Sequence, residues 1–121
     1  MEAETKAHML DWETYRQQVI SGVGSFSALS PDTVKGYALQ GNAGKKTNHL
    51  DPKTRELIAI AVAISLRCDG CITVHVDAAR KLGATKEEMA EALGVAVSIN
   101  AGAAVVYSTR ALDAFDTVAP T

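Results

Sequence analysis

An uncharged segment, residues 92–109, limits the possible folds of this chain more than any other feature. Its length approaches the roughly 20 residues that a helix needs to cross a bilayer. It is nevertheless rich in small and polar residues, namely Gly94, Ser98, Asn100, Gly102, Ser108 and Thr109. We therefore expect the segment to be buried in protein, and the chain to be soluble with no membrane partner. Because so much apolar surface exceeds what a short helical chain covers by itself, a homo-oligomer is expected.

The length of the chain indicates a single domain over residues 1–121, because this is the usual size of one domain. Within it we expect an N-terminal extension and helix in residues 1–30 and a core in residues 50–115. Hydrophobic residues make up 47% of the chain but aromatic residues only 5%, and alanine is abundant. Such a core consists of small side chains at close approach, which suits packed helices. The net charge of −2 provides no basic surface for a phosphate backbone, which argues against nucleic acid as a partner.

Helix start and stop signals support an all-α fold. Ser30-Pro31 and Asp51-Pro52 each place a capping residue before a proline at the first helical position. Thr85 and Glu88 form a predicted capping box, and Gly83 is a typical residue after a helix end. The expected helices are 11–20, 32–39, 53–67, 68–82, one that follows the capping box, and 101–115.

Two details of this assignment depend on the apolar pattern. The run 57–64 would also suit a buried parallel strand, but the Asp-Pro start, the alanines and the length of the segment favour a helix. Residues 22–30 and 41–46 are expected to interrupt the helices. In the helix after the capping box, the residues expected to point inward are Met89, Ala92, Leu93 and Ala96.

Cys68, Cys71 and His75 are the residues that most clearly indicate chemistry. On a helix, positions i, i+3 and i+7 share one face, so the three side chains form one stripe. A helix N-terminus, a neighbouring thiol and a nearby imidazole all lower the pKa of a thiol. The pattern therefore predicts a nucleophilic cysteine with a base in reach and a second thiol that forms a reversible disulfide with it.

Four other interpretations of the cysteines are weaker. Residues 1–4 are acidic where a secretory signal would be basic, so we expect a reducing cytoplasmic location and no structural disulfide. A zinc site needs four ligands, and beyond the two cysteines and His75 the chain offers only His49 or a carboxylate. Inert packing of the thiols would make their alignment with a histidine a coincidence. A thioredoxin fold would need a strand before the motif, and no convincing strand pattern is present.

The spacing Glu56-x11-Cys68-x2-Cys71-x3-His75 resembles the signature of the AhpD-like alkylhydroperoxidases, in the carboxymuconolactone decarboxylase superfamily. The similarity runs over residues 50–115, and the length is similar to that of single-repeat members. Where the best-known branch has a histidine before the second cysteine, this chain has Gly70.

The resemblance implies an all-helical bundle with a central antiparallel helical hairpin, assembled as a dimer, trimer or hexamer. It implies that Cys71 is the peroxidatic thiolate, while Cys68 supplies a proton and then closes the disulfide. His75, helped by Glu56, would deprotonate Cys71. The implied substrate is a hydroperoxide and the implied reductant a dithiol or lipoyl-type partner, with no cofactor and no metal.

Two alternatives to a thiol peroxidase stay open from the sequence. A lactone decarboxylase like the namesake of the superfamily would not need a cysteine pair, whereas a non-enzymatic redox sensor would use the dithiol to switch assembly or binding. The place of Glu56 is a separate question. A straight helix puts it about 18 Å from Cys68, and a hairpin would leave roughly 10 Å along the axis to His75. From the residues alone, Glu56 is expected to be a solvated first-turn carboxylate, and contact would need a kink, extended side chains, a water or a partner subunit.

Overall fold

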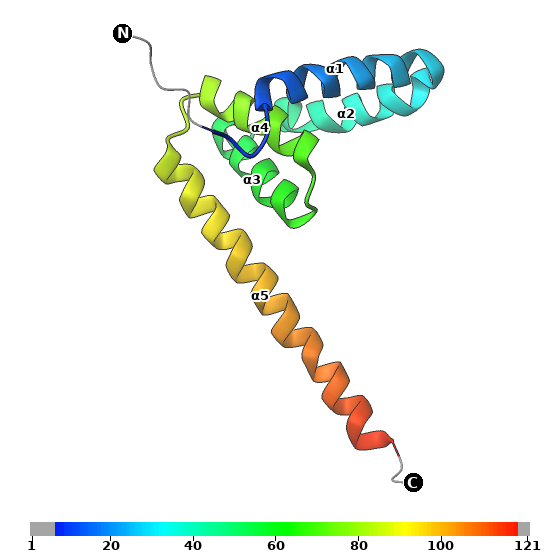
Figure 1. Cartoon of the computed structure of the whole chain (residues 1–121), viewed down its shortest axis with the longest axis vertical. Coiled ribbons are helices and arrows are strands. Elements are labelled where there is room, and N and C mark those ends of the chain that lie inside the picture. Colours follow the sequence, from blue (N-terminus) through cyan, green and yellow to red (C-terminus); the bar gives the residue numbers. More distant parts are fainter. Residues whose placement is uncertain (1–6, 119–121) are drawn as a thin grey trace.

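The computed structural model describes residues 7–118, and the acidic residues 1–4 lie outside this range. The described part of the chain contains five helices and no strand, so the predicted all-α class is confirmed (Figure 1). The helices are α1 (Trp12–Leu29), α2 (Pro31–Thr47), α3 (Pro52–Ser65), α4 (Asp69–Lys81) and α5 (Lys86–Thr117).

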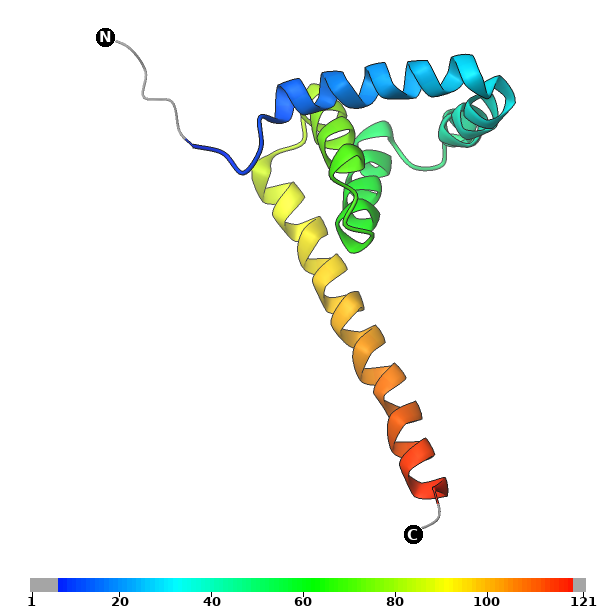
Figure 2. The same cartoon turned by 45° about the vertical axis from the view of Figure 1, so that its right-hand side comes forward.

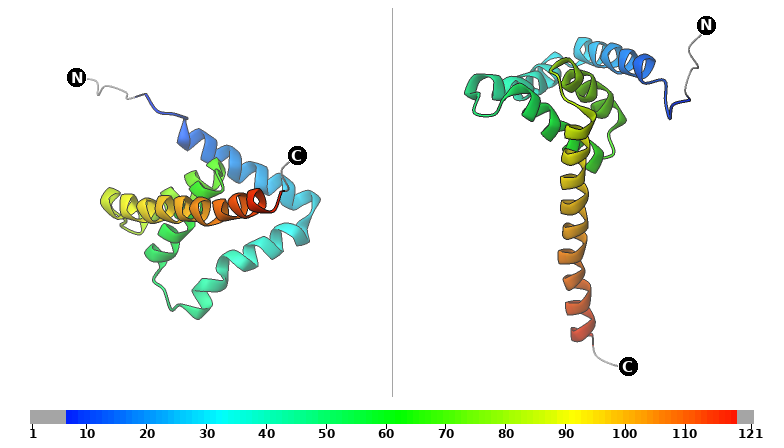
Figure 3. Two further views of the ribbon diagram at one scale, coloured as in Figure 1. Left: turned by 90° about the horizontal axis from the view of Figure 1, so that it is seen from below. Right: turned by 90° about the vertical axis from the view of Figure 1, so that its left-hand side faces the viewer.

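The helices form two hairpins and one projecting arm. α3 and α4 pack against each other as a central hairpin, and α1 crosses α4 while pairing with α2. The first half of α5 packs on α3, and its second half extends far beyond the other four helices (Figure 2). The right-hand view of Figure 3 again shows α5 projecting from the group formed by α1–α4, and in the left-hand view, seen from below, α5 overlies this group.

Side-chain capping contacts confirm the predicted starts of α3 and α5, whereas Ser30 precedes α2 without a side-chain capping hydrogen bond. The Asp51 carboxylate accepts a hydrogen bond from the Thr54 backbone N–H at 2.8 Å at the start of α3. The Thr85–Glu88 capping box is complete, because the Glu88 N–H donates to the Thr85 hydroxyl and the Glu88 carboxylate accepts from the Thr85 N–H. The starts of α3 and α5 are therefore fixed by local signals that the sequence displays.

The predicted interruptions of the helices are wrong. α1 continues through residues 22–29 and α2 through residues 41–46, and one continuous α5 replaces the two helices expected after residue 85. A glycine inside a helix costs only about 1 kcal/mol relative to alanine, which packing can offset. At Gly44 the Arg55 side chain packs against the helix, because a Cβ there would lie 2.7 Å from Cδ of Arg55 and the arginine would have to shift. α2 instead ends at Asn48, whose φ is 52°.

The buried core is small and consists mostly of alanine, as the composition predicts. Its apolar members are Ile60, Ala63, Ala79 and Ala96. Thr73 is the buried polar residue, and its hydroxyl donates to the backbone oxygen of Trp12 at 3.0 Å, which joins α4 to the start of α1. Of the residues expected to point inward from α5, Ala96 is buried and the other three are half-buried.

The second half of α5 is exposed in the single chain, where burial was expected. Val97, Val105 and Val106 are 63%, 69% and 69% exposed. By length and composition alone, α5 is long and apolar enough to cross a membrane. Only 6% of its 18-residue apolar stretch is buried in the structure. Apolar side chains point to all sides of this half, since residues 97, 105, 106 and 107 are spread around the helix. A helix that is apolar all round is normally buried, so other protein or lipid must cover it.

Candidate functional site

The turn between α3 and α4 positions both cysteines. Arg67 adopts a left-handed conformation with φ of 54°, and the Cys68 N–H then donates to the Ala63 backbone oxygen at 3.0 Å. Cys68 is thereby the N-cap residue of α4, and its Sγ accepts from the Cys71 N–H at 3.2 Å. The two cysteines form a disulfide in this structure, with Cα atoms 5.3 Å apart.

His75 lies one helical turn beyond Cys71 and contacts Glu56 across the central hairpin. Nδ1 of His75 is 2.7 Å from Oε2 of Glu56, and both side chains are partly buried, at 31% and 25% exposure. An ionised carboxylate can only accept a hydrogen bond, so the proton of a neutral His75 lies on Nδ1. Nε2 is left as the acceptor, which suits a base held in one orientation.

The expected gap between Glu56 and His75 is wrong, because the two residues touch within one subunit. α3 ends at Ser65 rather than at residue 67, so it rises about 13.5 Å beyond Glu56, and α4 returns about 9 Å to reach His75. The remaining few ångströms are bridged by the two side chains. Glu56 is therefore a partner of His75 and not a solvated first-turn carboxylate.

A cavity of about 480 Å³ opens over the dithiol. Cys68, Gly70, Cys71, Val74 and His75 line the side formed by α4. The opposite side comes from the α1–α2 hairpin, through Val19, Ile20, Val23, Phe26, Thr33, Val34 and Tyr37. These seven residues were not predicted as part of the site. Their helical spacing indicates an apolar face on each of two helices, but it does not show that both faces lie opposite the cysteines.

Gly70 brings α1 close to the motif. A Cβ at this position would lie 3.4 Å from Cγ2 of Val19, so α1 packs directly beside the glycine. The histidine that the best-known branch carries at this position has no counterpart here. His75 and Glu56 are the hydrogen-bonded pair that the structure places beside the dithiol.

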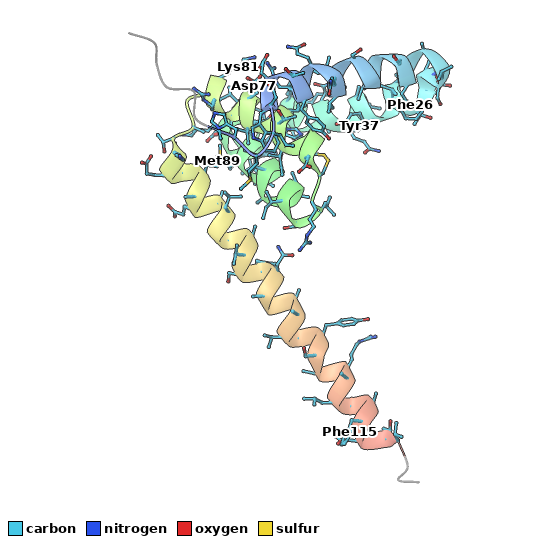
Figure 4. The ribbon with its side chains drawn as sticks, in the orientation of Figure 1. Phe26, Tyr37, Asp77, Lys81, Met89 and Phe115 are labelled. Carbon is cyan, nitrogen blue, oxygen red and sulfur yellow. A yellow bond between two sulfur atoms is a disulfide. The ribbon has the colours of Figure 1, made fainter. Side chains whose placement is uncertain are left out.

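One ion pair, between Arg16 and Asp77, joins α1 to α4. Arg16 donates to Asp77 at 2.9 Å and to Glu13 at 2.6 Å, and Lys81 pairs with Asp77 at 2.9 Å. Figure 4 shows Asp77 and Lys81 together at one end of α4. The hydrogen bond from Lys81 holds the pKa of Asp77 below its usual value, and the charge of Arg16 acts in the same direction. These contacts fix the wall that α1 contributes to the cavity.

Metal ligation has no candidate in residues 7–118, where no group of three or more His, Cys, Asp or Glu side chains could hold an ion. His49 is exposed in the α2–α3 connection, and His8 is exposed before α1. The candidate site therefore consists of the dithiol, His75 with Glu56, and the surrounding cavity.

The fold and site together define a class, that of all-helical proteins with a dithiol at a helix N-terminus and a paired histidine and glutamate. A model of the carboxymuconolactone decarboxylase family matches residues 31–114, which include the whole motif. The chain belongs to this family.

Several proteins are similar to this chain over most of its length. A carboxymuconolactone decarboxylase family protein from Legionella pneumophila, solved in its apo form, is 35% identical with a TM-score of 0.69, and the match covers 87% of this chain and 94% of that one. An uncharacterized protein of Haemophilus influenzae is 44% identical over 87% of this chain and 93% of its own length. Uncharacterized protein 4 in the cox locus of Paracoccus denitrificans is 45% identical over 57% of this chain and 62% of its own.

Proposed function

We propose that this chain is a thiol-dependent peroxidase that reduces hydroperoxides through the Cys68–Cys71 dithiol. One observation carries the proposal. Both cysteines and His75 line the same cavity, and Glu56 orients the imidazole from behind. A thiol, a base and a group that orients the base form the arrangement that nucleophilic catalysis requires. A lactone decarboxylase would use neither the second thiol nor its place at the start of α4.

In the first step, His75 takes the proton of Cys71, and the resulting thiolate attacks the terminal oxygen of the hydroperoxide, ROOH. An S–O bond forms and the O–O bond breaks. The sulfur loses two electrons and becomes a sulfenic acid. The RO⁻ group takes up a proton from a donor at the site and leaves as the alcohol ROH. Cys68 and the histidinium are the two proton donors available at the site.

In the second step, the thiolate of Cys68 attacks the sulfenic sulfur of Cys71. An S–S bond forms, the S–O bond breaks, and hydroxide leaves as water after it takes up the proton from Cys68. The product is the disulfide that this structure contains. A dithiol or lipoyl-type reductant then supplies two electrons and two protons to restore both thiols. Because such reductants act in the cytoplasm, we propose that location for the chain.

The proposal is tested by the stoichiometry of a single turnover. Fully reduced protein mixed with one equivalent of hydroperoxide should lose both thiols, yield one equivalent of alcohol and become lighter by two hydrogen atoms. Thiol titration, product analysis and intact-protein mass spectrometry measure these three quantities. Thiols that survive excess peroxide would contradict the proposal. One turnover that no dithiol can repeat would instead favour a redox sensor.

We further propose that other copies of the chain cover the exposed half of α5. Eight large apolar side chains of α5 are 60–79% exposed, namely Val95, Val97, Ile99, Val105, Val106, Tyr107, Leu112 and Phe115. Their area is comparable to the roughly 800 Å² that one partner buries in a standard interface. Protein is favoured over lipid because the first half of α5 packs on α3, where Asn100 donates to the Ser65 hydroxyl at 2.7 Å.

Light scattering checks the assembly. The chain should give a multiple of 12.7 kDa, and Val106→Asp should shift it towards the monomer because it places a charge in the interface. Leu29→Asp is the matched control, since Leu29 is 86% exposed on α1 and lies outside α5. A wild-type monomer, or recovery of the chain with membranes, would refute the proposed assembly.

A further inference from the structure

The wall that faces the dithiol is apolar and belongs to the α1–α2 hairpin. Val23 and Phe26 of α1 lie opposite Val34 and Tyr37 of α2 around the cavity. Figure 4 shows Phe26 and Tyr37 on this hairpin. α1 lies outside residues 31–114, so part of this wall comes from outside the region that the family model matches.

The cavity offers no charged partner to a ligand apart from the reacting groups. Its polar side chains are the two cysteines, His75 and the hydroxyls of Thr33 and Tyr37, and no lysine, arginine or carboxylate lines it. A substrate with a charged tail would lose its hydration here without gaining an ion pair. The group attached to the peroxide should therefore be uncharged.

The cavity is also much larger than hydrogen peroxide needs. Its volume of about 480 Å³ lies within the range of roughly 300–1,000 Å³ that is typical of small-molecule sites. A water molecule takes up only about 30 Å³ of liquid, and hydrogen peroxide is not much larger. Bound hydrogen peroxide would leave the hairpin wall in contact with water, whereas a bulky apolar group would cover it.

Phe26 and Tyr37 present accessible apolar surface to such a group. The two side chains are 51% and 64% exposed, so packing within the chain leaves much of their ring surface accessible. The start of α1 is joined to α4 by Arg16 with Asp77 and by Thr73 with the Trp12 backbone, and α2 packs on α1. The apolar wall is thereby placed opposite the thiols, where a substrate tail can contact it.

We infer that the α1–α2 hairpin is the specificity element of the proposed peroxidase, with Phe26 and Tyr37 contacting the uncharged, bulky apolar group of an organic hydroperoxide. The inference rests on the proposed function. The peroxide oxygens lie at the dithiol and the apolar group lies against the hairpin, and no additional chemical step is involved.

The test compares cumene hydroperoxide with hydrogen peroxide in the presence of excess dithiothreitol. The wild type should show at least a tenfold higher kcat/KM for cumene hydroperoxide. Phe26→Ala and Tyr37→Ala should each lower this value by about tenfold through KM, because hydrophobic contacts of this size change discrimination by that order. In both variants the kcat/KM for hydrogen peroxide should fall much less, because that substrate has no apolar group to contact the two rings.

Leu29→Ala and Leu39→Ala are matched controls, since both leucines are exposed on the same two helices and do not line the cavity. They should behave as wild type with both peroxides. Equal wild-type kcat/KM values for the two peroxides, or a parallel loss with both in Phe26→Ala, would overturn this inference and leave the proposed function intact. Failure to consume either peroxide would overturn the proposed function itself. Binding of the unreactive product 2-phenyl-2-propanol, measured by calorimetry, should weaken in Phe26→Ala and Tyr37→Ala, and unchanged binding would count against the hairpin.

Discussion

Cys71→Ser should abolish hydroperoxide consumption in the presence of a dithiol, leaving only the background rate of the buffer. A serine hydroxyl is not ionised by a neighbouring imidazole at neutral pH, and oxygen is a far weaker nucleophile than sulfur towards a peroxide. His75, Glu56 and the cavity should be unchanged, because the two side chains differ by a single atom. Steady-state peroxide consumption measures the effect.

Cys68→Ser is the matched control for Cys71→Ser, because it makes the same substitution at the other cysteine. It should still consume the first equivalent of peroxide and stop as a sulfenic acid on Cys71, which dimedone traps and mass spectrometry locates. The opposite pattern, with the sulfenic acid on Cys68 of Cys71→Ser, would reverse the two roles. Loss of the first step in both variants would indicate that neither thiol reacts alone.

His75→Gln should lower kcat/KM by about a hundredfold or more, since general base catalysis contributes roughly 10²–10⁴-fold. Glutamine keeps a polar group near Glu56 but cannot take a proton from Cys71. Glu56→Gln should have a smaller effect, because it removes only the charge that orients the imidazole at 2.7 Å. Peroxide consumption under dithiol excess gives both values.

The pH dependence separates a base from a structural residue. The rate of His75→Gln should rise towards that of wild type as the pH is raised, because hydroxide in solution then removes the proton that the imidazole takes from Cys71 in the wild type. A purely structural defect would not be rescued in this way. His49→Gln and Glu87→Gln alter exposed residues outside the cavity and should leave the rate unchanged.

Local signals explain which parts of the fold could be predicted from the sequence. The starts of α3 and α5 depend on Asp51 and Thr85, whose bonds reach only three residues along the chain. The stripe of Cys68, Cys71 and His75 likewise follows from the period of one helix. Each of these features is contained within a few neighbouring residues, so a single sequence displays it.

The features that could not be predicted depend on contacts between distant residues. Gly44 lies inside α2 with the Arg55 side chain packed beside it, and no neighbour in the sequence reveals that contact. The pairing of Glu56 with His75 depended on where α3 ends, and an error of two residues there was enough to separate them in the prediction. The hairpin wall over the dithiol needs two helices in the correct relative position, and the sequence pattern of each helix alone does not determine it.

The place of Cys68 as the N-cap of α4 has a consequence for the electrochemistry of the disulfide. When the bond opens, negative charge on the dithiol lies within the first turn of α4, at the positive end of the helix dipole. The helix thus stabilises the reduced form more than the oxidised form, which raises the reduction potential and makes the pair a better electron acceptor. We therefore expect this disulfide to be reduced to two thiols more easily than a disulfide that stabilises a fold.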